Sequence, residues 1–219
     1  MVAVRPLARP EVAFTGGIAH HAPAVRSLAE DEEALIQAIR RGDRESGREL
    51  YRRLVQVVDI TLSRVVGPGT PEHDDLLQNV FEQVIRTIRS GRFQHRCSLR
   101  SWAAAIACRV GLNAIRSRRT ERAVLDRTQS ASEEVPAIAA HDPERVALAR
   151  DELRRLRAEL AGIPAARAEA WLLCDVLGYG LSEVAELTGA SVAAVESRLV
   201  RGRRDLSARI EAWRERSST

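Results

Sequence analysis

The amino-acid sequence predicts an all-α protein with two small helical domains joined by a flexible linker, the second domain ending in a helix-turn-helix. The composition is rich in alanine, leucine, arginine and glutamate and only 4% aromatic, which favours helices over sheets. Apolar residues recur at helical spacing through two long parts of the chain. Between these parts lies a polar stretch, residues 120–142, that Pro136 interrupts and that is too long for an ordinary loop.

The first domain is predicted to comprise residues 30–119, after an N-terminal arm. Residues 1–29 mix proline, glycine, alanine and histidine without helical periodicity, so we expect a disordered arm. Glycine and proline positions divide the domain into four helices. The expected limits of these helices are residues 31–41, 44–66, 71–90 and 98–119.

The second domain, residues 143–215, is predicted to begin with Pro143 in the first turn of a helix that Asp142 caps. This helix is expected to reach Ala161, and the next one spans residues 164–177. A helix-turn-helix then follows in residues 181–206.

Three small residues shape the predicted helix-turn-helix. Ser182 can cap its first helix, Gly189 permits the tight turn, and Ser191 can cap its second helix. The first helix offers Val184, Ala185 and Leu187 as apolar contacts.

On the second helix of this motif, helical spacing separates an inner face from an outer face. The spacing predicts that Val192, Val195 and Leu199 face inward, and that Ala194, Ser197, Arg198 and Arg201 face outward. A basic second helix after a short capped one is the arrangement that reads a DNA major groove. The alternative is an αα-hairpin whose arginines are simply solvated.

Charge is distributed unevenly along the chain, although its formal net charge is only +4. Residues 30–82 contain twelve acidic residues against seven arginines, a net of −5. Residues 96–127 contain eight arginines against two acidic residues, a net of +6. An acidic segment followed by a basic one suggests one surface for protein and another for nucleic acid; solvated helix faces are the alternative.

The pattern of cysteines and apolar residues indicates no metal, no cofactor and no membrane insertion. Of three cysteines none forms a C-x-x-C pair, and His95 with Cys97 lacks two further ligands at zinc-site spacing. No apolar run approaches the ~18 residues of a membrane span. Pro6 and Pro10 interrupt any signal-peptide core. We therefore expect a cytoplasmic protein with reduced thiols.

The segment DDLLQNVF, residues 74–81, places polar groups on the exposed side of a helix. A catalytic pair of Asp74 and Asp75 is disfavoured, because adjacent helical residues diverge by about 100°. Their charge can instead complement the helix dipole. A third interpretation is a polar docking face for another protein, with Leu76 as its apolar anchor. We predict no catalytic residue and no enzyme.

The segment from Phe93 to Arg122 combines arginines with an aromatic residue, Trp102, and an amide, Asn113. Basic grooves with aromatic side chains suit single-stranded DNA, because bases stack on the rings while guanidinium groups hold phosphates. Core packing is the alternative role for Trp102.

Together these segments resemble a known family, the extracytoplasmic-function (ECF) sigma factors of bacterial RNA polymerase. The resemblance covers roughly residues 31–122 and 153–210, with the motifs in the family's order. The segments that carry it are DDLLQNVF, SLRSWAAAIA, RVGLNAIRSRR, CDVLGYGLSEVAELTG and AAVESRLVRGRRDL.

The resemblance implies a promoter-specificity subunit with core RNA polymerase and promoter DNA as partners. It implies three sets of binding residues, which we list here by partner. The polymerase set is Asp75, Leu76, Gln78, Asn79 and Phe81. The set for the melted −10 element is Arg100, Trp102, Arg109, Asn113, Arg116, Arg118 and Arg119. The set for the duplex −35 element is Ser191, Ala194, Glu196, Ser197, Arg198, Arg201, Arg203 and Arg204.

The chain departs from the family's pattern at three of these positions. Asn79 stands where an acidic residue is usual, and Asn113 where aspartate is common. Glu196 replaces a typical lysine, which exchanges a charge that attracts phosphate for one that repels it. The alternative is that Glu196 accepts a hydrogen bond from a cytosine amino group, and we expect it to shift the −35 preference.

The resemblance also implies an anti-sigma partner, which no residue identifies. The rival interpretation is a helix-turn-helix regulator that acts without polymerase.

Overall fold

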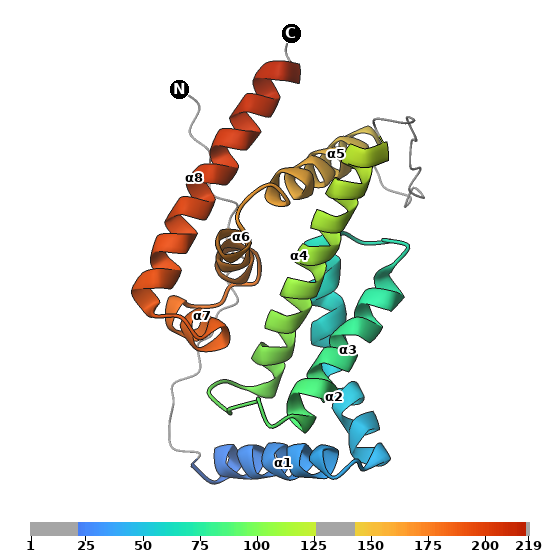
Figure 1. Cartoon of the computed structure of the whole chain (residues 1–219), viewed down its shortest axis with the longest axis vertical. Coiled ribbons are helices and arrows are strands. Elements are labelled where there is room, and N and C mark those ends of the chain that lie inside the picture. Colours follow the sequence, from blue (N-terminus) through green and yellow to red (C-terminus); the bar gives the residue numbers. More distant parts are fainter. Residues whose placement is uncertain (1–21, 126–142, 218–219) are drawn as a thin grey trace.

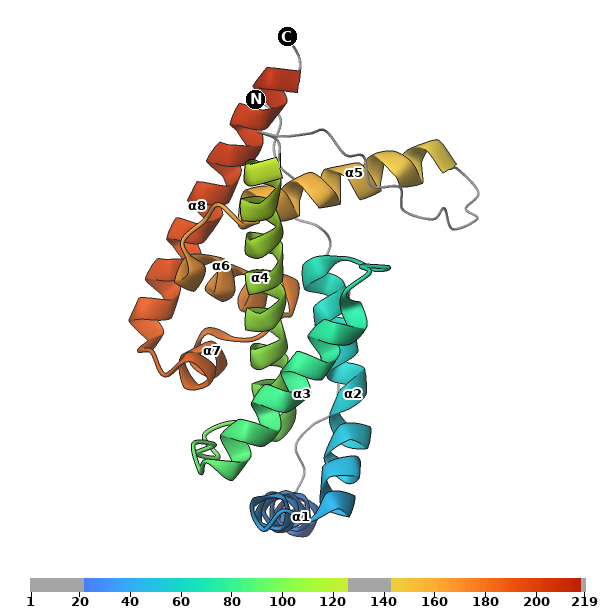
Figure 2. The ribbon, with the colours of Figure 1, turned by 45° about the vertical axis from the view of Figure 1, so that its right-hand side comes forward.

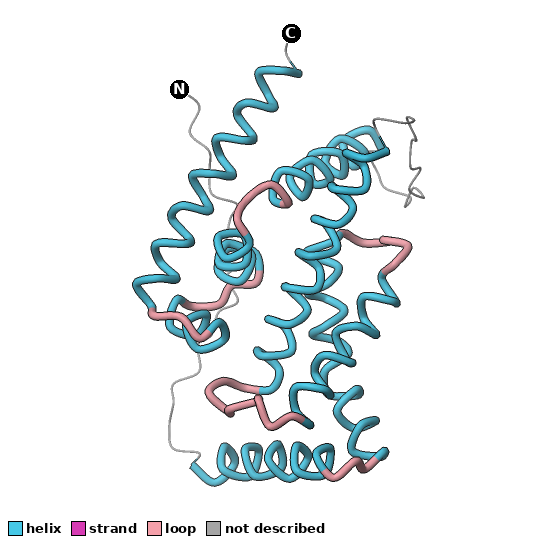
Figure 3. Tube along the Cα trace, viewed as in Figure 1, coloured by secondary structure: helices cyan, strands magenta, loops and turns pink. Residues whose placement is uncertain are grey.

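The computed structural model describes residues 22–125 and 143–217, and the regular elements in these two ranges are helices (Figures 1 and 3). This confirms the predicted all-α class. The first range contains α1 (Ala22–Arg40), α2 (Arg44–Val66), α3 (His73–Arg89) and α4 (Leu99–Leu125). The second contains α5 (Pro143–Leu160), α6 (Ala165–Trp171), a π-helical turn η1 (Leu172–Val176), α7 (Leu181–Thr188) and α8 (Val192–Ser217).

In the first domain, α2, α3 and α4 pack side by side and α1 lies across one end of them (Figures 1 and 2). Caps and glycines set the helix limits. The Asp43 carboxylate accepts the Ser46 N–H at 2.9 Å and so caps α2. Ser98 accepts the Ser101 N–H at 3.0 Å at the start of α4. Glu32 of α1 also accepts the Leu99 N–H at 2.6 Å, which ties α1 to α4.

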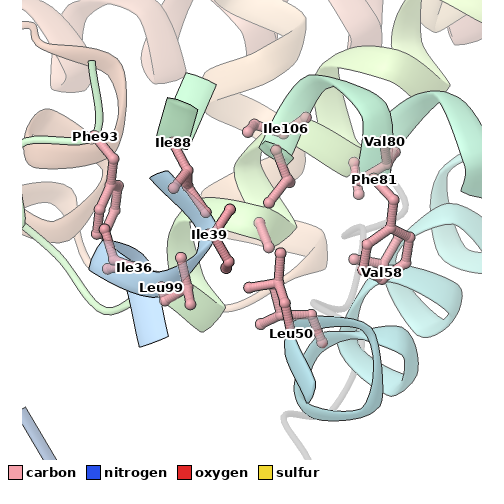
Figure 4. Packing of buried hydrophobic residues seen from close by; sticks show 14 of the residues in the cluster. Ile36, Ile39, Leu50, Val58, Val80, Phe81, Ile88, Phe93, Leu99 and Ile106 are labelled. Carbon is pink, nitrogen blue, oxygen red and sulfur yellow. The ribbon is translucent and has the colours of Figure 1, made fainter. Parts of the chain in front are cut away.

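The first domain has an apolar core of its own, supplied by all four helices (Figure 4). Ile36 of α1, Leu50 and Val58 of α2, and Val80 and Ile88 of α3 are fully buried in it. Burial of this many aliphatic side chains is the main force that holds the four helices together.

In the second domain, α7 and α8 form the expected helix-turn-helix. Gly189 ends α7 in the left-handed conformation, with φ 67°, which glycine adopts without a steric penalty. Ser191 accepts the Ala194 N–H at 3.2 Å and caps α8. Val195 and Leu199 are buried as predicted.

Several predicted details were wrong. The first helix begins at Ala22 rather than Asp31, so residues 22–29 of the expected arm are helical, while residues 1–21 lie outside the described part. Ser182 does not cap α7, because the helix already begins at Leu181, after Gly180. Val192 is 46% exposed rather than buried, because the first turn of α8 lies outside the apolar cluster around Val195.

The expected linker, residues 120–142, is shorter in the structure, because α4 continues to Leu125. The remainder, residues 126–142, lies outside the described residues. The domain boundaries beyond these two corrections stay a prediction.

The two domains pack against each other along α4, which the sequence did not predict. We call their common apolar cluster the shared core. The first domain contributes the end of α2 and one side of α4, with residues Val65, Val66, Ala105, Cys108, Leu112 and Ile115. The second domain contributes Leu160, Ile163, Ala168, Leu172, Leu173, Val184, Ala185, Leu187, Val195 and Leu206.

Candidate nucleic-acid and polymerase interfaces

The candidate −35 residues lie on α8 and its N-terminal turn. Glu196, Arg201 and Arg204 are exposed, and Ala194, Ser197 and Arg198 are half-buried. Arg198 and Arg201 have no ion-pair partner among the residues that the structure describes. Their guanidinium groups are therefore available to an external anion. Ser191 is exposed, and its hydroxyl accepts the Ala194 N–H in the helix cap.

Arg203 differs from these arginines because it already has a protein partner. Its Nε and Nη2 atoms donate to the two oxygens of Asp175 at 2.8 and 2.6 Å. This forked pair raises the pKa of Arg203 further. The contact joins α8 to η1, so Arg203 positions the helix in this conformation.

Two further residues hold α8 against α6, and sequence reasoning missed both. Arg167 of α6 donates to Asp205 of α8 at 2.6 Å. A Cβ atom on Gly202 would lie 2.8 Å from the Arg167 carbonyl oxygen, so only glycine permits this approach. The one available signal was a glycine inside a strongly helical segment.

The candidate −10 residues lie along α4 but do not share one open face. Arg100 and Asn113 are exposed. Trp102 is half-buried against Phe93, with ring centroids 4.7 Å apart. Arg118 points to α3 and donates to Glu72 at 2.6 Å. Both roles proposed for Trp102 remain available, because part of its ring is buried and part reaches solvent.

The other three candidate arginines of α4 contact the second domain. Arg109 Nε donates to Glu169 of α6 at 2.6 Å, and its Nη2 to the Leu187 carbonyl at 3.4 Å. Arg116 Nη2 donates to the Ile163 carbonyl at 2.5 Å. Partial burial there lowers the pKa of Arg116. Arg119 Nη1 donates to the Ala158 carbonyl at 3.1 Å.

The candidate polymerase residues of α3 fall into two groups. Asp75, Gln78 and Asn79 are exposed and line an open hollow with Glu82 and Arg86. Leu76 is half-buried and packs against both apolar clusters. Phe81 is 8% exposed, and its ring lies 4.7 Å from that of Tyr51.

Tyr51 of α2 is 44% exposed beside Phe81, and sequence reasoning missed it. An exposed aromatic ring that borders a polar face is a common binding feature. Periodicity could not single it out, because only the packing of α2 against α3 brings it to this surface.

Comparison with known proteins identifies both domains. The model of Sigma-70 region 2 matches residues 50–121, and that of Sigma-70 region 4 matches residues 153–206. The chain is 30% identical over 170 residues to the RNA polymerase sigma factor CarQ of Myxococcus xanthus, covering 76% of this chain and 90% of that protein. The chain belongs to the ECF sigma factors of the sigma-70 family. It is an RNA polymerase sigma factor, whose partners are core polymerase and promoter DNA.

The alignments with other relatives also cover most of this sigma factor. It is 29% identical over 187 residues to the ECF RNA polymerase sigma factor SigC of Mycobacterium tuberculosis, covering 84% of this chain and 96% of that one. A solved structure of CnrH in complex with the cytosolic domain of CnrY is 24% identical, covers 83% of this chain and 97% of that one, and superposes with a TM-score of 0.48.

The two matched regions contain every candidate residue of this sigma factor. The polymerase and −10 candidates lie within residues 50–121, and the −35 candidates within residues 153–206.

The thiols and acidic groups that the structure describes were compared with the arrangement that a metal site needs. In residues 22–125 and 143–217, no three histidine, cysteine or acidic side chains come together as a metal site. Cys97, Cys108 and Cys174 are free thiols, and burial raises the pKa of each. None of the described helices is both long and apolar enough to span a bilayer.

Proposed function

We propose that this sigma factor uses three separate faces to initiate transcription. The exposed side of α3 binds core polymerase, α4 holds the melted −10 strand, and α7 with α8 reads the −35 element. The observation that carries the proposal is the α8 surface: a helix capped by Ser191 and fixed by Gly202 carries the exposed Arg201 and the half-buried Arg198, neither of which has an ion-pair partner among the described residues. A rigid basic helix of this kind fits a major groove.

On α8, the residues divide between reading bases and holding the helix. Arg198 and Arg201 contact base edges or phosphates, and Arg204 contacts the DNA backbone. Arg203 keeps its pair with Asp175 and acts as a positioning residue. Glu196 is exposed at the level of these arginines and sets base preference.

A randomised promoter pool tests the role of Glu196. Holoenzyme with the parent chain and holoenzyme with Glu196→Lys are used to select −35 sequences from the same pool. We expect the parent to enrich cytosine opposite Glu196 and the variant to lose that preference. Identical −35 sequences from both would refute the assignment.

On α4, arginines hold phosphates of the single strand while the half-buried Trp102 ring stacks on an unstacked base. Unstacking a base costs a few kcal/mol, which such contacts offset. Arg100 and Asn113 are exposed and can bind without rearrangement. Arg109, Arg116 and Arg119 must first leave their present partners.

On α3, Asp75, Gln78 and Asn79 form the direct contact with polymerase. Leu76 and Phe81 pack inside the domain and support that face from below. The chain performs no chemistry of its own in this role. It acts in the cytoplasm, where bacterial polymerase works, and we expect residues 126–142 to pass through polymerase as the link between the domains.

Co-purification with core polymerase tests the α3 face. We compare Asp75→Ala/Gln78→Ala with a matched control, Glu152→Ala/Gln56→Ala, whose side chains are exposed elsewhere. We expect only the first pair to lose polymerase. If both variants retain polymerase, the α3 assignment fails.

In-vitro transcription with core polymerase on a library of genomic fragments tests activity and promoter choice together. We expect transcripts whose upstream sequences share a −35 and a −10 element.

A further inference from the structure

The arginines of α8 that lie nearest to the proposed DNA surface differ in their protein partners. Arg203 donates from Nε and Nη2 to both oxygens of Asp175, at 2.8 and 2.6 Å. Arg198 and Arg201 have no ion-pair partner among the residues that the structure describes. Of these three arginines, Arg203 alone therefore has its positive charge balanced by a carboxylate of the described protein.

Arg204, the next residue along α8, has a much weaker contact. Its Nη2 atom lies 3.8 Å from one oxygen of Asp205, and its side chain is 76% exposed. The other Asp205 oxygen accepts a hydrogen bond from Arg167 at 2.6 Å. Asp205 is thus shared between two arginines, whereas Asp175 pairs with Arg203 and with no other cation among the described residues.

Asp175 belongs to the π-helical turn η1, which is held in place on both sides of this residue. Leu172 and Leu173, just before it, are at most 2% exposed. Their carbonyl oxygens accept the N–H groups of Leu177 and Tyr179, each at 2.9 Å. The Asp175 carboxylate is therefore already positioned before it pairs, and its side chain is only 26% exposed. A forked pair with a fixed carboxylate persists better than an ordinary surface ion pair.

Arg203 lies on the same flank of α8 as Glu196. The two residues are seven positions apart, which is about two helical turns, so both side chains leave the helix on one side. Both residues are exposed. This flank carries the carboxylates of Glu196 and Asp175 against the one guanidinium of Arg203. Arg201 and Arg204 point about 100° or more away around the helix. Phosphates are therefore attracted to one side of α8 and not to the other.

An arginine that is free to bind phosphate strengthens binding to every DNA sequence. On DNA without a −35 element, no base contacts fix α8, and each free arginine can find a phosphate. Arg203 can do so only by leaving Asp175, and the Asp175 carboxylate would then lie near the phosphate and repel it. The pair thus removes one contact that does not depend on sequence.

We propose that Asp175 is a specificity-determining residue of −35 recognition, although it contacts no DNA. By withholding Arg203 from phosphates, it lowers the affinity for DNA without a −35 element more than the affinity for the element itself. On the element, base contacts by Arg198, Arg201 and Glu196 fix α8, and Arg203 stays with Asp175. The ratio of the two affinities decides promoter choice, because sites without the element far outnumber promoters.

This inference rests on the proposed −35 role of α8, and one binding experiment tests both. The full-length chain is titrated against two short fluorescent duplexes across a salt series. One duplex carries the −35 sequence that the parent holoenzyme enriches from the randomised pool, and the other carries the same bases in scrambled order. The variants are Asp175→Asn, which removes the charge and keeps the size, Arg203→Gln, and the two combined.

We expect Asp175→Asn to bind the scrambled duplex about fivefold more tightly than the parent. The salt dependence should become steeper by about one counterion, because the freed Arg203 adds one phosphate contact. Binding to the −35 duplex should change by less than about twofold, since base contacts dominate there. Arg203→Gln should gain no affinity for the scrambled duplex, and the combined variant should lose the gain of Asp175→Asn.

The matched control is Glu211→Gln, which removes one exposed carboxylate from α8 and changes the net charge equally. Glu211 has no ion-pair partner among the described residues. We expect it to bind both duplexes like the parent. An equal gain in Glu211→Gln and Asp175→Asn would mean a general effect of charge and would overturn the inference.

Three further outcomes separate the inference from its foundation. Equal changes in Asp175→Asn and Arg203→Gln would mean that the pair only holds α8 in place. A fivefold gain on both duplexes would show a phosphate contact without any effect on specificity. Either result would overturn the role of Asp175 and leave the −35 role of α8 standing. A parent chain that binds both duplexes equally would refute the −35 role, and the inference with it.

Discussion

The arginines of α4 and those of α8 have similar sequence surroundings but different environments in the structure. Arg109, Arg116 and Arg119 are bonded to the second domain, whereas Arg198 and Arg201 have no ion-pair partner among the described residues. Two basic helices of one sigma factor therefore differ in how free their arginines are to bind a partner. The two on α8 can meet an external anion in this conformation, whereas the three on α4 must first lose their bonds to the second domain. A count of arginines along the chain does not reveal this difference.

The largest expected effect comes from separating the second domain from α4. Leu112→Asp places a carboxylate in the shared core, where an isolated buried charge costs several kcal/mol. We expect the domains to separate while both stay helical, seen as a larger radius of gyration in X-ray scattering with unchanged far-ultraviolet circular dichroism.

The control for this prediction is Leu62→Asp, which puts the same charge into the first domain's own core. That core joins the helices of a single domain, so a buried charge there should unfold the domain, and we expect loss of helical signal. If Leu112→Asp also loses its helical signal, the two domains cannot exist apart. The arginines of α4 then have no free state in which to resemble those of α8.

The next largest effect, on DNA binding, is expected at Arg198 and Arg201 of α8, which have no ion-pair partner among the described residues. Arg198→Ala/Arg201→Ala should weaken holoenzyme binding to a −35-containing duplex by at least tenfold, because each base or phosphate contact contributes about 1–3 kcal/mol. Fluorescence anisotropy across a salt series measures it, and the salt dependence should become shallower. Arg155→Ala, on α5 over the Trp213 ring, is the control and should bind normally.

A smaller effect, on thermal stability, tests how firmly the contact with α6 fixes α8. Gly202→Ala brings a Cβ atom to 2.8 Å from the Arg167 carbonyl oxygen, so α6 and α8 must shift, at a cost of about 1–3 kcal/mol. We expect a lower Tm in calorimetry. Gly47→Ala in α2 meets nothing within 4 Å and should raise the Tm slightly. Equal Tm changes in both variants would mean that the close approach at Gly202 does not constrain α8.

The smallest expected effect is a pH dependence of stability in the first domain, away from both groups of arginines. Hydrogen bonds from Ser46, its hydroxyl first and its N–H second, lower the pKa of the Asp43 carboxyl. A lowered folded pKa contributes stability that is complete above the unfolded pKa, about 3.9, and disappears as pH falls through the folded value.

Urea unfolding between pH 5 and pH 2 measures this contribution. Asp43→Asn keeps the helix cap but does not titrate, so the difference in stability between parent and variant should shrink as the pH falls. A difference that is constant with pH would show that the Asp43 cap is not linked to protonation.

Much of this sigma factor was predictable because local rules decide it. Apolar spacing placed α2, α3, α4 and α5 within a few residues of their limits, except that α4 runs on to Leu125. Gly189 and Ser191 act as turn and cap where predicted, since capping depends on a few neighbouring residues. The order of the motifs along the chain, with the resemblance that they carry, was enough to indicate the family.

Only the tertiary structure decided which of the candidate residues are accessible. The sequence by itself determined that Phe81 and Arg109 lie on helices with one apolar and one polar side. It could not determine that Phe81 packs beside Tyr51, or that Arg109 meets Glu169 sixty residues later in the chain. The physical reason is range: helix formation and capping depend on neighbours within about four residues, whereas partners across an interface depend on how two whole domains bury their apolar surface.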